Sequence, residues 1–219
     1  ATVDANGIAY VTVATSATAM GSTGTLTLSL SGGQSSVATV TANPIYALTS
    51  GPDTIDASAT NNAVINGSIT TSAPTFSTLD SIKGGLNTTF NVIDVTTTAG
   101  NSYLSPAGAV VSGIATMNLS TNGSLGNAAN STVLDFSAYG VQTLNASTGN
   151  GTGTLSSDVK VGSSTNLNLT VNSSTGNTVT VSGGAIDTVT NAGTDSVSVT
   201  GAALTSVSVT DKTGTVTIN

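Results

Sequence analysis

The sequence predicts an all-β protein whose larger part is a parallel β-solenoid. Ser, Thr, Gly, Ala, Asn and Val fill most of the chain, whereas helix formers other than Ala and Leu are scarce. Apolar and polar residues alternate with a period of two, as in residues 25–30, which read TLTLSL. Short apolar triplets also recur in the second half at intervals of about 18 residues, which is typical of a repeat architecture.

The triplets predict β-solenoid coils over residues 110–219, each with two or three short strands joined by Gly, Asn or Ser turns. Val, Leu and Ile are expected to stack inside, while Thr, Ser and Asn form ladders outside. The triplets lie at 159–161, 167–169, 179–181, 197–199, 207–209 and 216–218. The repeat interval joins Val161 to Val179, Val179 to Val197, and Val189 to Val207. A β-sandwich stays open as the alternative, because it also has many short alternating strands.

Residues 1–43 differ from the rest. Alternating runs separated by Gly turns predict three or four antiparallel strands there, and these resemble the last strands of a bacterial immunoglobulin-like β-sandwich. Asn43-Pro44 marks the expected boundary, after which residues 44–109 form the start of the solenoid. Both chain ends lie in strand-like sequence, so we expect a fragment of a longer protein.

The composition argues against catalysis and nucleic-acid binding. Cys, His, Trp, Glu and Arg are absent, so the usual general base, thiol nucleophile and thiolate ligand are missing. The net charge of −7 disfavours contact with phosphates. No apolar run approaches the roughly 18 residues of a membrane span. We therefore expect a non-enzymatic protein that does not insert into membranes. A two-carboxylate glycosidase is the enzymatic alternative.

Two segments carry a family resemblance. Residues 47–58 read ALTSGPDTIDAS and residues 76–92 read FSTLDSIKGGLNTTFNV. In this order they resemble the L-T-x-G-x-D-x-[IFL] and D-x-[IL]-x-G-G-x-x-x-D-x-[LF]-x-[VI] segments of proteobacterial surface-layer (S-layer) proteins related to repeats-in-toxin calcium-binding proteins. Residues 111–119, VSGIATMNL, resemble a further step of that group. Thr88 or Thr89 stands where the group has Asp, and the nonapeptide G-G-x-G-x-D-x-U-x is not repeated.

The resemblance implies a structural protein secreted without an N-terminal signal to the extracellular cell surface of a bacterium. There its copies would self-assemble, with calcium as cofactor, into a homo-oligomeric lattice or filament. A surface polysaccharide is a candidate anchor. The alternative is an adhesin or fibre stalk built on a β-solenoid.

Five oxygen-bearing side chains in the motif segments are candidate calcium ligands, because calcium prefers hard oxygen ligands on short side chains next to Gly and Asn turns. They are Asp53, Asp56, Asp80, Asn87 and Asp94. The alternative is that each Asp caps its own turn through the backbone.

The remaining polar positions have simpler expected roles. Asp158 is expected to form a weak surface charge pair with Lys160. Asn-x-Ser/Thr sequons at Asn66, Asn118 and Asn145 are expected to arise by chance in so polar a chain. Solvated turn residues at coil corners are expected at Asp135, Asp187, Asp195 and Asp211, with calcium bound between coils as the alternative.

Overall fold

The computed structural model describes residues 23–29, 35–41, 43–69, 73–94, 102–103, 106, 108–126, 133–148, 157–172, 178–192, 196–211 and 214–219. All regular secondary structure in these ranges is β. The described residues accordingly include no helix that could span a bilayer. The chain divides into two compact units, Ala1–Ile45 and Tyr46–Asn219.

The first unit contains a β-hairpin. Strands β1 (Thr23–Ser29) and β2 (Ser35–Thr41) pair in antiparallel register, with Thr23 opposite Thr41. This pairing agrees with the antiparallel strands expected there. The immunoglobulin-like domain predicted for residues 1–43 stays a prediction, because much of that range lies outside the described residues.

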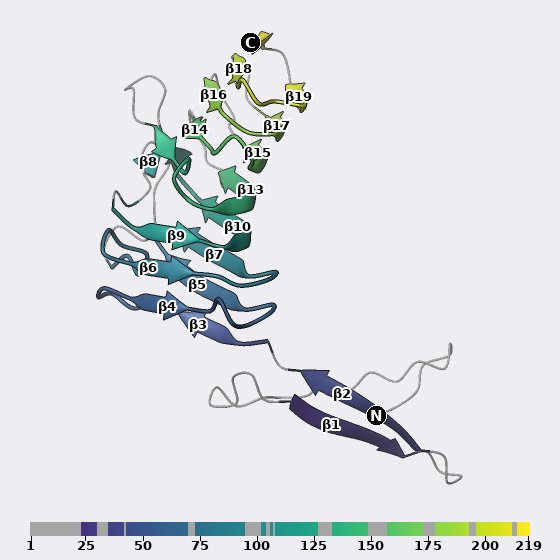
Figure 1. Ribbon diagram of the computed structural model, residues 1–219. Coiled ribbons are helices and arrows are strands. Elements are labelled where there is room, and N and C mark those ends of the chain that lie inside the picture. The colour runs from purple at the N-terminus through teal and green to yellow at the C-terminus, as the bar shows by residue number, and fades with distance from the viewer. Residues whose placement is uncertain are drawn as a thin grey trace. The chain divides into compact units, whose positions relative to one another are not determined.

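The second unit is a parallel β-solenoid, as predicted (Figure 1). Eight strands form its long sheet, in the spatial order β19-β17-β15-β13-β10-β7-β5-β3. Every neighbouring pair from β5 to β19 is parallel, which rules out the antiparallel β-sandwich alternative for this part of the chain. The strands are β3 (Ile45–Ala47), β5 (Val64–Ser68), β7 (Thr89–Asp94), β10 (Ile114–Thr121), β13 (Val141–Thr148), β15 (Asn166–Val171), β17 (Ile186–Asn191) and β19 (Ser206–Asp211).

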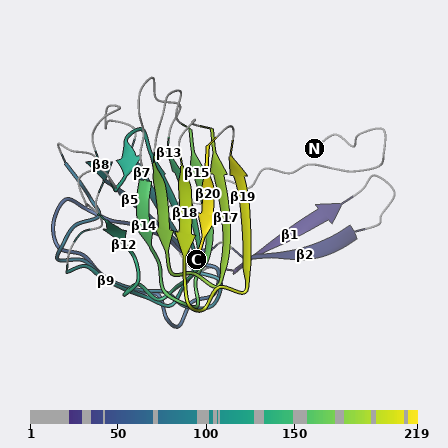
Figure 2. The same cartoon turned by 90° about the horizontal axis from the view of Figure 1, so that it is seen from above.

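Each coil returns to the long sheet through one or both of two further sheets (Figure 2). The second sheet contains β8 (Ser102–Tyr103), β11 (Ser124–Leu125), β12 (Leu134–Asp135), β14 (Ser157–Lys160), β16 (Val179–Ser182), β18 (Val197–Thr200) and β20 (Val216–Ile218). The third sheet contains β4 (Thr54–Asp56), β6 (Ser81–Lys83) and β9 (Val110–Ser112). All six triplets identified in the sequence lie on or at the end of these strands.

The solenoid continues without a break across residues 109 and 110, because β7 and β10 are neighbours in the long sheet. Its coil length changes along the chain. Register partners are 27 residues apart at Asn91 and Asn118, but 20 residues apart at Asn191 and Asp211. The coils that begin at β7 and β10 carry three strands and span 27 residues, whereas those that begin at β13 and β15 carry two strands and span 23 and 20 residues.

The interval of about 18 residues is confirmed for Val179 and Val197, which are register partners on β16 and β18. The other two intervals are wrong. Val189 pairs with Val209 rather than Val207, and Val179 pairs with Ser157 rather than Val161. The two shifts, by two and by four residues, are both even and therefore keep the same side chains inside. The alternating pattern therefore identifies the buried face but does not determine the register.

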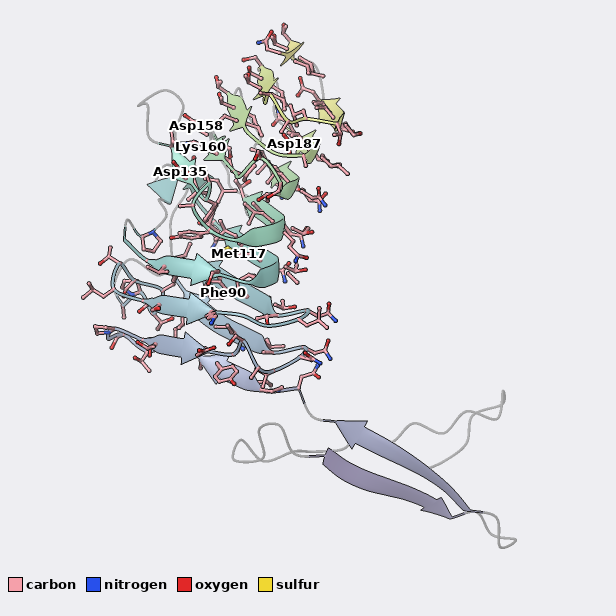
Figure 3. The ribbon with its side chains drawn as sticks, in the orientation of Figure 1. Phe90, Met117, Asp135, Asp158, Lys160 and Asp187 are labelled. Atoms are coloured by element: carbon pink, nitrogen blue, oxygen red, sulfur yellow. The ribbon has the colours of Figure 1, made fainter. Side chains whose placement is uncertain are left out.

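Apolar side chains stack in columns inside the coils. The first inward column of the long sheet runs, in register, through Ile65, Phe90, Met117, Leu144, Leu167, Asp187 and Val207. Phe90, Met117 and Asp187 are labelled in Figure 3. Phe76 packs edge-on against Phe90, with ring centroids 5.1 Å apart. Burial of each large side chain contributes about 1.5–3 kcal/mol, so this core is the main source of stability.

Glycine occupies the corner at which the second sheet turns back to the long sheet. Gly183 has a φ of 95°, and a Cβ atom there would overlap the carbonyl oxygen of Val161 in the preceding coil. Gly201 in the next coil is similarly close, because its Cβ would lie 2.6 Å from the Gly183 oxygen. The coils stack tightly at this corner because these residues lack a side chain.

Gly183→Ala should lower the free energy of unfolding by about 1–3 kcal/mol, since it adds both a positive-φ strain and a backbone overlap. Gly51→Ala is the matched control, because the nearest atom to its Cβ would lie 3.9 Å away. Urea unfolding followed by circular dichroism measures both. Equal midpoints for the two variants would contradict the close packing at this corner.

Candidate functional site

The predicted calcium segment is held together by carboxylates that accept hydrogen bonds from nearby turns. Asp80 is buried and accepts from the backbone N–H of Ser77 at 2.6 Å and from that of Asp53 at 3.0 Å. Asp80 therefore caps its own turn and also joins two successive coils. Its two carboxylate oxygens are both used in this structural role.

Asp53 and Asp56 form similar caps on the surface. The Asp53 carboxylate accepts from the N–H of Thr49 at 2.7 Å and also from its hydroxyl. Asp56 accepts from the N–H of Ser58 at 3.0 Å and from its hydroxyl. These bonds from Ser58 hold the pKa of the Asp56 carboxyl below its ordinary value.

Asn87 has a φ of 57° and donates from Nδ2 to Oδ1 of Asn62, whose φ is 56°, at 3.2 Å. These two residues therefore form a stacked pair of left-handed turns. Asp94 ends β7, and its side chain lies outside the described part of the chain. Of the five candidate ligands, the structure links only Asp53 and Asp80 directly, through the Asp53 backbone.

The described carboxylates of the motif segment do not fit a preformed calcium cage. They face N–H and O–H donors, whereas calcium requires six to eight converging oxygen ligands. Within the described ranges, no group of three or more acidic side chains comes together. The turn-capping alternative accounts for these contacts. Calcium binding by the chain stays a prediction.

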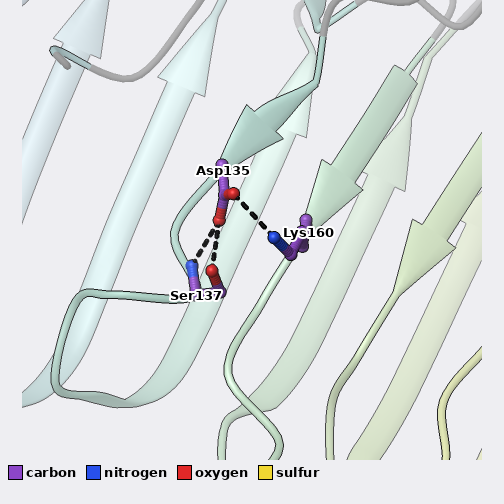
Figure 4. Close-up of polar contacts among 3 residues, drawn as sticks. All are labelled: Asp135, Ser137 and Lys160. Carbon is purple, nitrogen blue, oxygen red and sulfur yellow. Dashed lines mark hydrogen bonds and ion pairs between the residues drawn. The ribbon is translucent and has the colours of Figure 1, made fainter.

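A surface ion pair joins two coils of the second sheet. Lys160 Nζ lies 2.9 Å from Asp135 Oδ2, and Asp135 also accepts from the N–H of Ser137 at 2.8 Å (Figure 4). Partial burial raises the pKa of the Asp135 carboxyl, but the bonds from Ser137 and Lys160 outweigh it and hold that pKa below its ordinary value. The expected pairing of Lys160 with Asp158 is therefore wrong. The two acidic residues differ because Asp135 is the register partner of Lys160.

The outer face of the long sheet carries an amide ladder, formed by Asn66, Asn91, Asn118, Asn145 and Asn168. Each Asn after Asn66 donates from Nδ2 to Oδ1 of the Asn in the preceding coil, at 2.8–2.9 Å. Parallel register places these side chains directly above one another, about 4.8 Å apart. The sequence-based expectation of outward Asn ladders is thereby confirmed.

The ladder explains the sequons. Outward positions alternate along a strand, so a Ser or Thr two residues after a ladder Asn lies in the next outward column. Ser68, Ser120, Ser147 and Thr170 occupy that column. The expectation that the sequons arise by chance is replaced by a structural reason. The Asn-x-Ser/Thr spacing follows from two adjacent polar columns of one sheet.

The outward positions of the seven long-sheet strands from β5 to β19 form a surface that we call the neutral face. No charged side chain occupies these positions. Each strand contributes three such positions, and they hold Asn, Ser and Thr together with Val64, Ile93 and Ile186. Asp56 lies on the third sheet and Asp135 lies on the second sheet, and the described Asp and Lys side chains near them lie on those sheets as well. The neutral face is therefore a polar, uncharged surface on an acidic chain.

A groove of about 320 Å³ runs along the neutral face across β7, β10, β13 and β15. One wall is the amide ladder from Asn91 to Asn168, and the other is the column of Ile93 followed by the hydroxyl residues Ser120, Ser147 and Thr170. Sequence reasoning identified the polar ladders but not this groove, because its walls become neighbours only once the register is known.

Asp187 is the polar exception in the core. It was expected as a solvated turn residue, but it is the second residue of β17, points inward and is 0% exposed. Its register partners are Leu167 and Val207, and neither carboxylate oxygen has a hydrogen-bond partner among the described residues. Burial raises the pKa of this carboxyl to about 6.

The chain matches no family model, no curated protein and no solved structure. Its function is therefore inferred from the geometry of its own surfaces.

Asn118→Ala should lower the free energy of unfolding by about 2 kcal/mol, because it removes two ladder bonds of about 1 kcal/mol each. Asn66→Ala is the matched control, since Asn66 ends the ladder and its side chain makes one described hydrogen bond, with Asn91. Its loss should be about 1 kcal/mol. Urea unfolding of both variants measures the difference, and equal losses would show that the ladder does not stabilise the fold.

Asp187→Leu should stabilise the protein at neutral pH. The pKa of the Asp187 carboxyl is about 6 in the folded protein, above its ordinary 3.8. The folded state therefore holds this proton more tightly than the unfolded state. Its contribution to stability is fully present below about pH 4 and is lost as pH rises through 6. A shift of about two units corresponds to about 3 kcal/mol. Urea midpoints between pH 4 and 8 should fall more steeply with pH for the wild type than for Asp187→Leu, in which the half-buried Asp158 carboxyl, whose pKa is also raised, keeps a residual slope.

Asp56→Asn controls for a general loss of negative charge. The pKa of Asp56 is lowered, so its contribution is present above its ordinary value and is lost only as pH falls below it. This variant should therefore keep the wild-type slope between pH 5 and 7. A wild-type midpoint that stays constant across that range would contradict the unpartnered burial of Asp187.

Proposed function

We propose that this chain is a structural protein of the bacterial cell surface whose copies self-associate into a layer. The neutral face is the observation that carries the proposal. Copies of a chain with net charge −7 repel each other, and contact is least unfavourable where no charge must be desolvated. By strand spacing, the face measures about 30 Å by about 17 Å, or about 500 Å² per copy. Two copies would bury about 1,000 Å², which is the lower limit for a specific interface.

The contacts between successive coils support a mechanical role for the chain. Backbone pairing, the amide ladder and the Asp135–Lys160 pair all run from one coil to the next. The same groups are therefore committed to holding the stack together. Secretion to the cell surface, as the sequence resemblance implies, is part of this proposal.

A second candidate is an adhesin or fibre stalk. The stack of coils favours it, because a solenoid extends by nearest-neighbour contacts alone and needs no second copy. A stalk would remain an elongated monomer. A layer protein would form sheets.

Negative-stain electron microscopy of the 219-residue chain should show periodic sheets. Thr188→Lys/Thr190→Lys places two charges on exposed positions of the neutral face and should abolish them through like-charge repulsion. Thr200→Lys/Thr217→Lys is the control, since both residues are exposed on strands of the second sheet. Isolated rods for the wild type, checked by analytical ultracentrifugation, would contradict the layer and favour the stalk.

The same experiment tests calcium. Sheets that form in calcium and dissolve with chelator would support the calcium-dependent lattice that the sequence resemblance implies. Sheets that persist in chelator would leave the Asp residues of the motif segment as turn caps alone.

A further inference from the structure

The amide ladder has hydrogen-bonding groups to spare. A side-chain amide offers two N–H donors and two acceptor lone pairs. Asn118 uses one donor toward Asn91 and one lone pair toward Asn145, and Asn91 and Asn145 also make one bond in each direction. Each of these three residues therefore keeps one donor and one acceptor. They recur about every 4.8 Å along one wall of the groove.

The opposite wall repeats with the same spacing. Ser120, Ser147 and Thr170 are register partners, and each presents a hydroxyl that can donate and accept. Between the two walls lies the backbone of buried residues such as Leu119 and Ala146, which gives the groove a floor. From β7 to β15 the groove spans about 14 Å, three strand spacings. Its 320 Å³ falls within the usual range of ligand pockets, about 300–1,000 Å³.

The chemistry of the groove selects its ligand. None of its lining residues carries a charge, so it offers nothing to neutralise a phosphate, sulfate or carboxylate. Donors and acceptors occur together and repeat along the axis. A matching ligand is uncharged, linear and rich in hydroxyl groups, with C–H surface to place against the floor. A second copy of the chain is the other possible occupant, but its exposed Leu79 and Leu86 side chains offer apolar surface without the repeated hydroxyl groups that the walls match.

We propose that the groove binds a strand of neutral polysaccharide laid along the solenoid axis. The spare amide N–H groups donate to sugar hydroxyls, and the spare amide lone pairs and the Ser and Thr hydroxyls accept from them. The site deepens the proposed function by supplying the chemical class of an anchor at the cell surface. It requires only one copy of the chain, so binding and self-association can fail separately.

Affinity electrophoresis of the 219-residue chain through native gels containing dextran, mannan or galactan tests the proposal. At least one polysaccharide should reduce the mobility of the wild type by about twofold or more. Ser120→Lys/Ser147→Lys fills the groove with two long side chains and should remove the retardation. Thr188→Lys/Thr190→Lys adds the same charge to the same face outside the groove and should be retarded like the wild type, with each mobility normalised to a gel without polysaccharide.

Circular dichroism and urea midpoints establish that both double variants are folded. Wild-type mobility unaffected by all three neutral polysaccharides would overturn the proposal. Equal retardation of both double variants would also overturn it, because the binding surface would then lie elsewhere. Retardation by alginate alone would show a charged ligand instead. Loss of sheets is expected for both double variants because both add charge to the neutral face, so the retardation, and not sheet formation, tests the groove.

Discussion

In-register parallel stacking is the constraint on which the rest of the structure depends. Each long-sheet residue between β5 and β17 lies directly between its partners in neighbouring coils, about 4.8 Å away, so its side chain must suit the residues stacked on it. Leu and Val meet this condition inside and Asn meets it outside, because an amide can donate to one neighbour and accept from the other. Like charges fail it. Two charged pairs occur between described register partners, Asp56 with Lys83 and Asp135 with Lys160, and both join opposite signs.

This constraint determines how much of the structure can be predicted from the sequence. Period-two alternation assigns each residue to the inside or the outside, and that was enough to predict β14, β16 and β18 as solenoid strands. The register could not be predicted, because Val207 and Val209 are equally suitable partners for Val189 by the alternating pattern alone. The alternating pattern is weak in strand β17, because Asp187 occupies an inward position at which an apolar residue is expected. The groove could not be foreseen for the same reason, because its walls are columns and columns exist only in a defined register.

The amino-acid composition follows from the architecture. The acidic residues are all Asp, and the described ones of the motif segment use their short side chains to reach N–H groups two to four residues away or in the next coil. Glu would place its carboxylate too far out for several of these caps. Asp187 departs from this use, since it lies beside Gly184 in the core and its carboxylate has no hydrogen-bond partner in the described part of the chain. In natural proteins, residues that break the pattern of their surroundings mark sites of strain or of function.

The end of the amide ladder has a mechanical consequence. Coils contact only their neighbours, so tension along the stack is carried through one coil boundary after another. Between β5 and β15 each boundary has a side-chain amide bond beside the backbone bonds. The ladder stops at Asn168, because Thr188 follows it in the column and has no amide group. The boundary between β15 and β17 lacks the amide bond of the ladder boundaries and adjoins the buried Asp187 carboxylate, so under tension we expect it to separate before them.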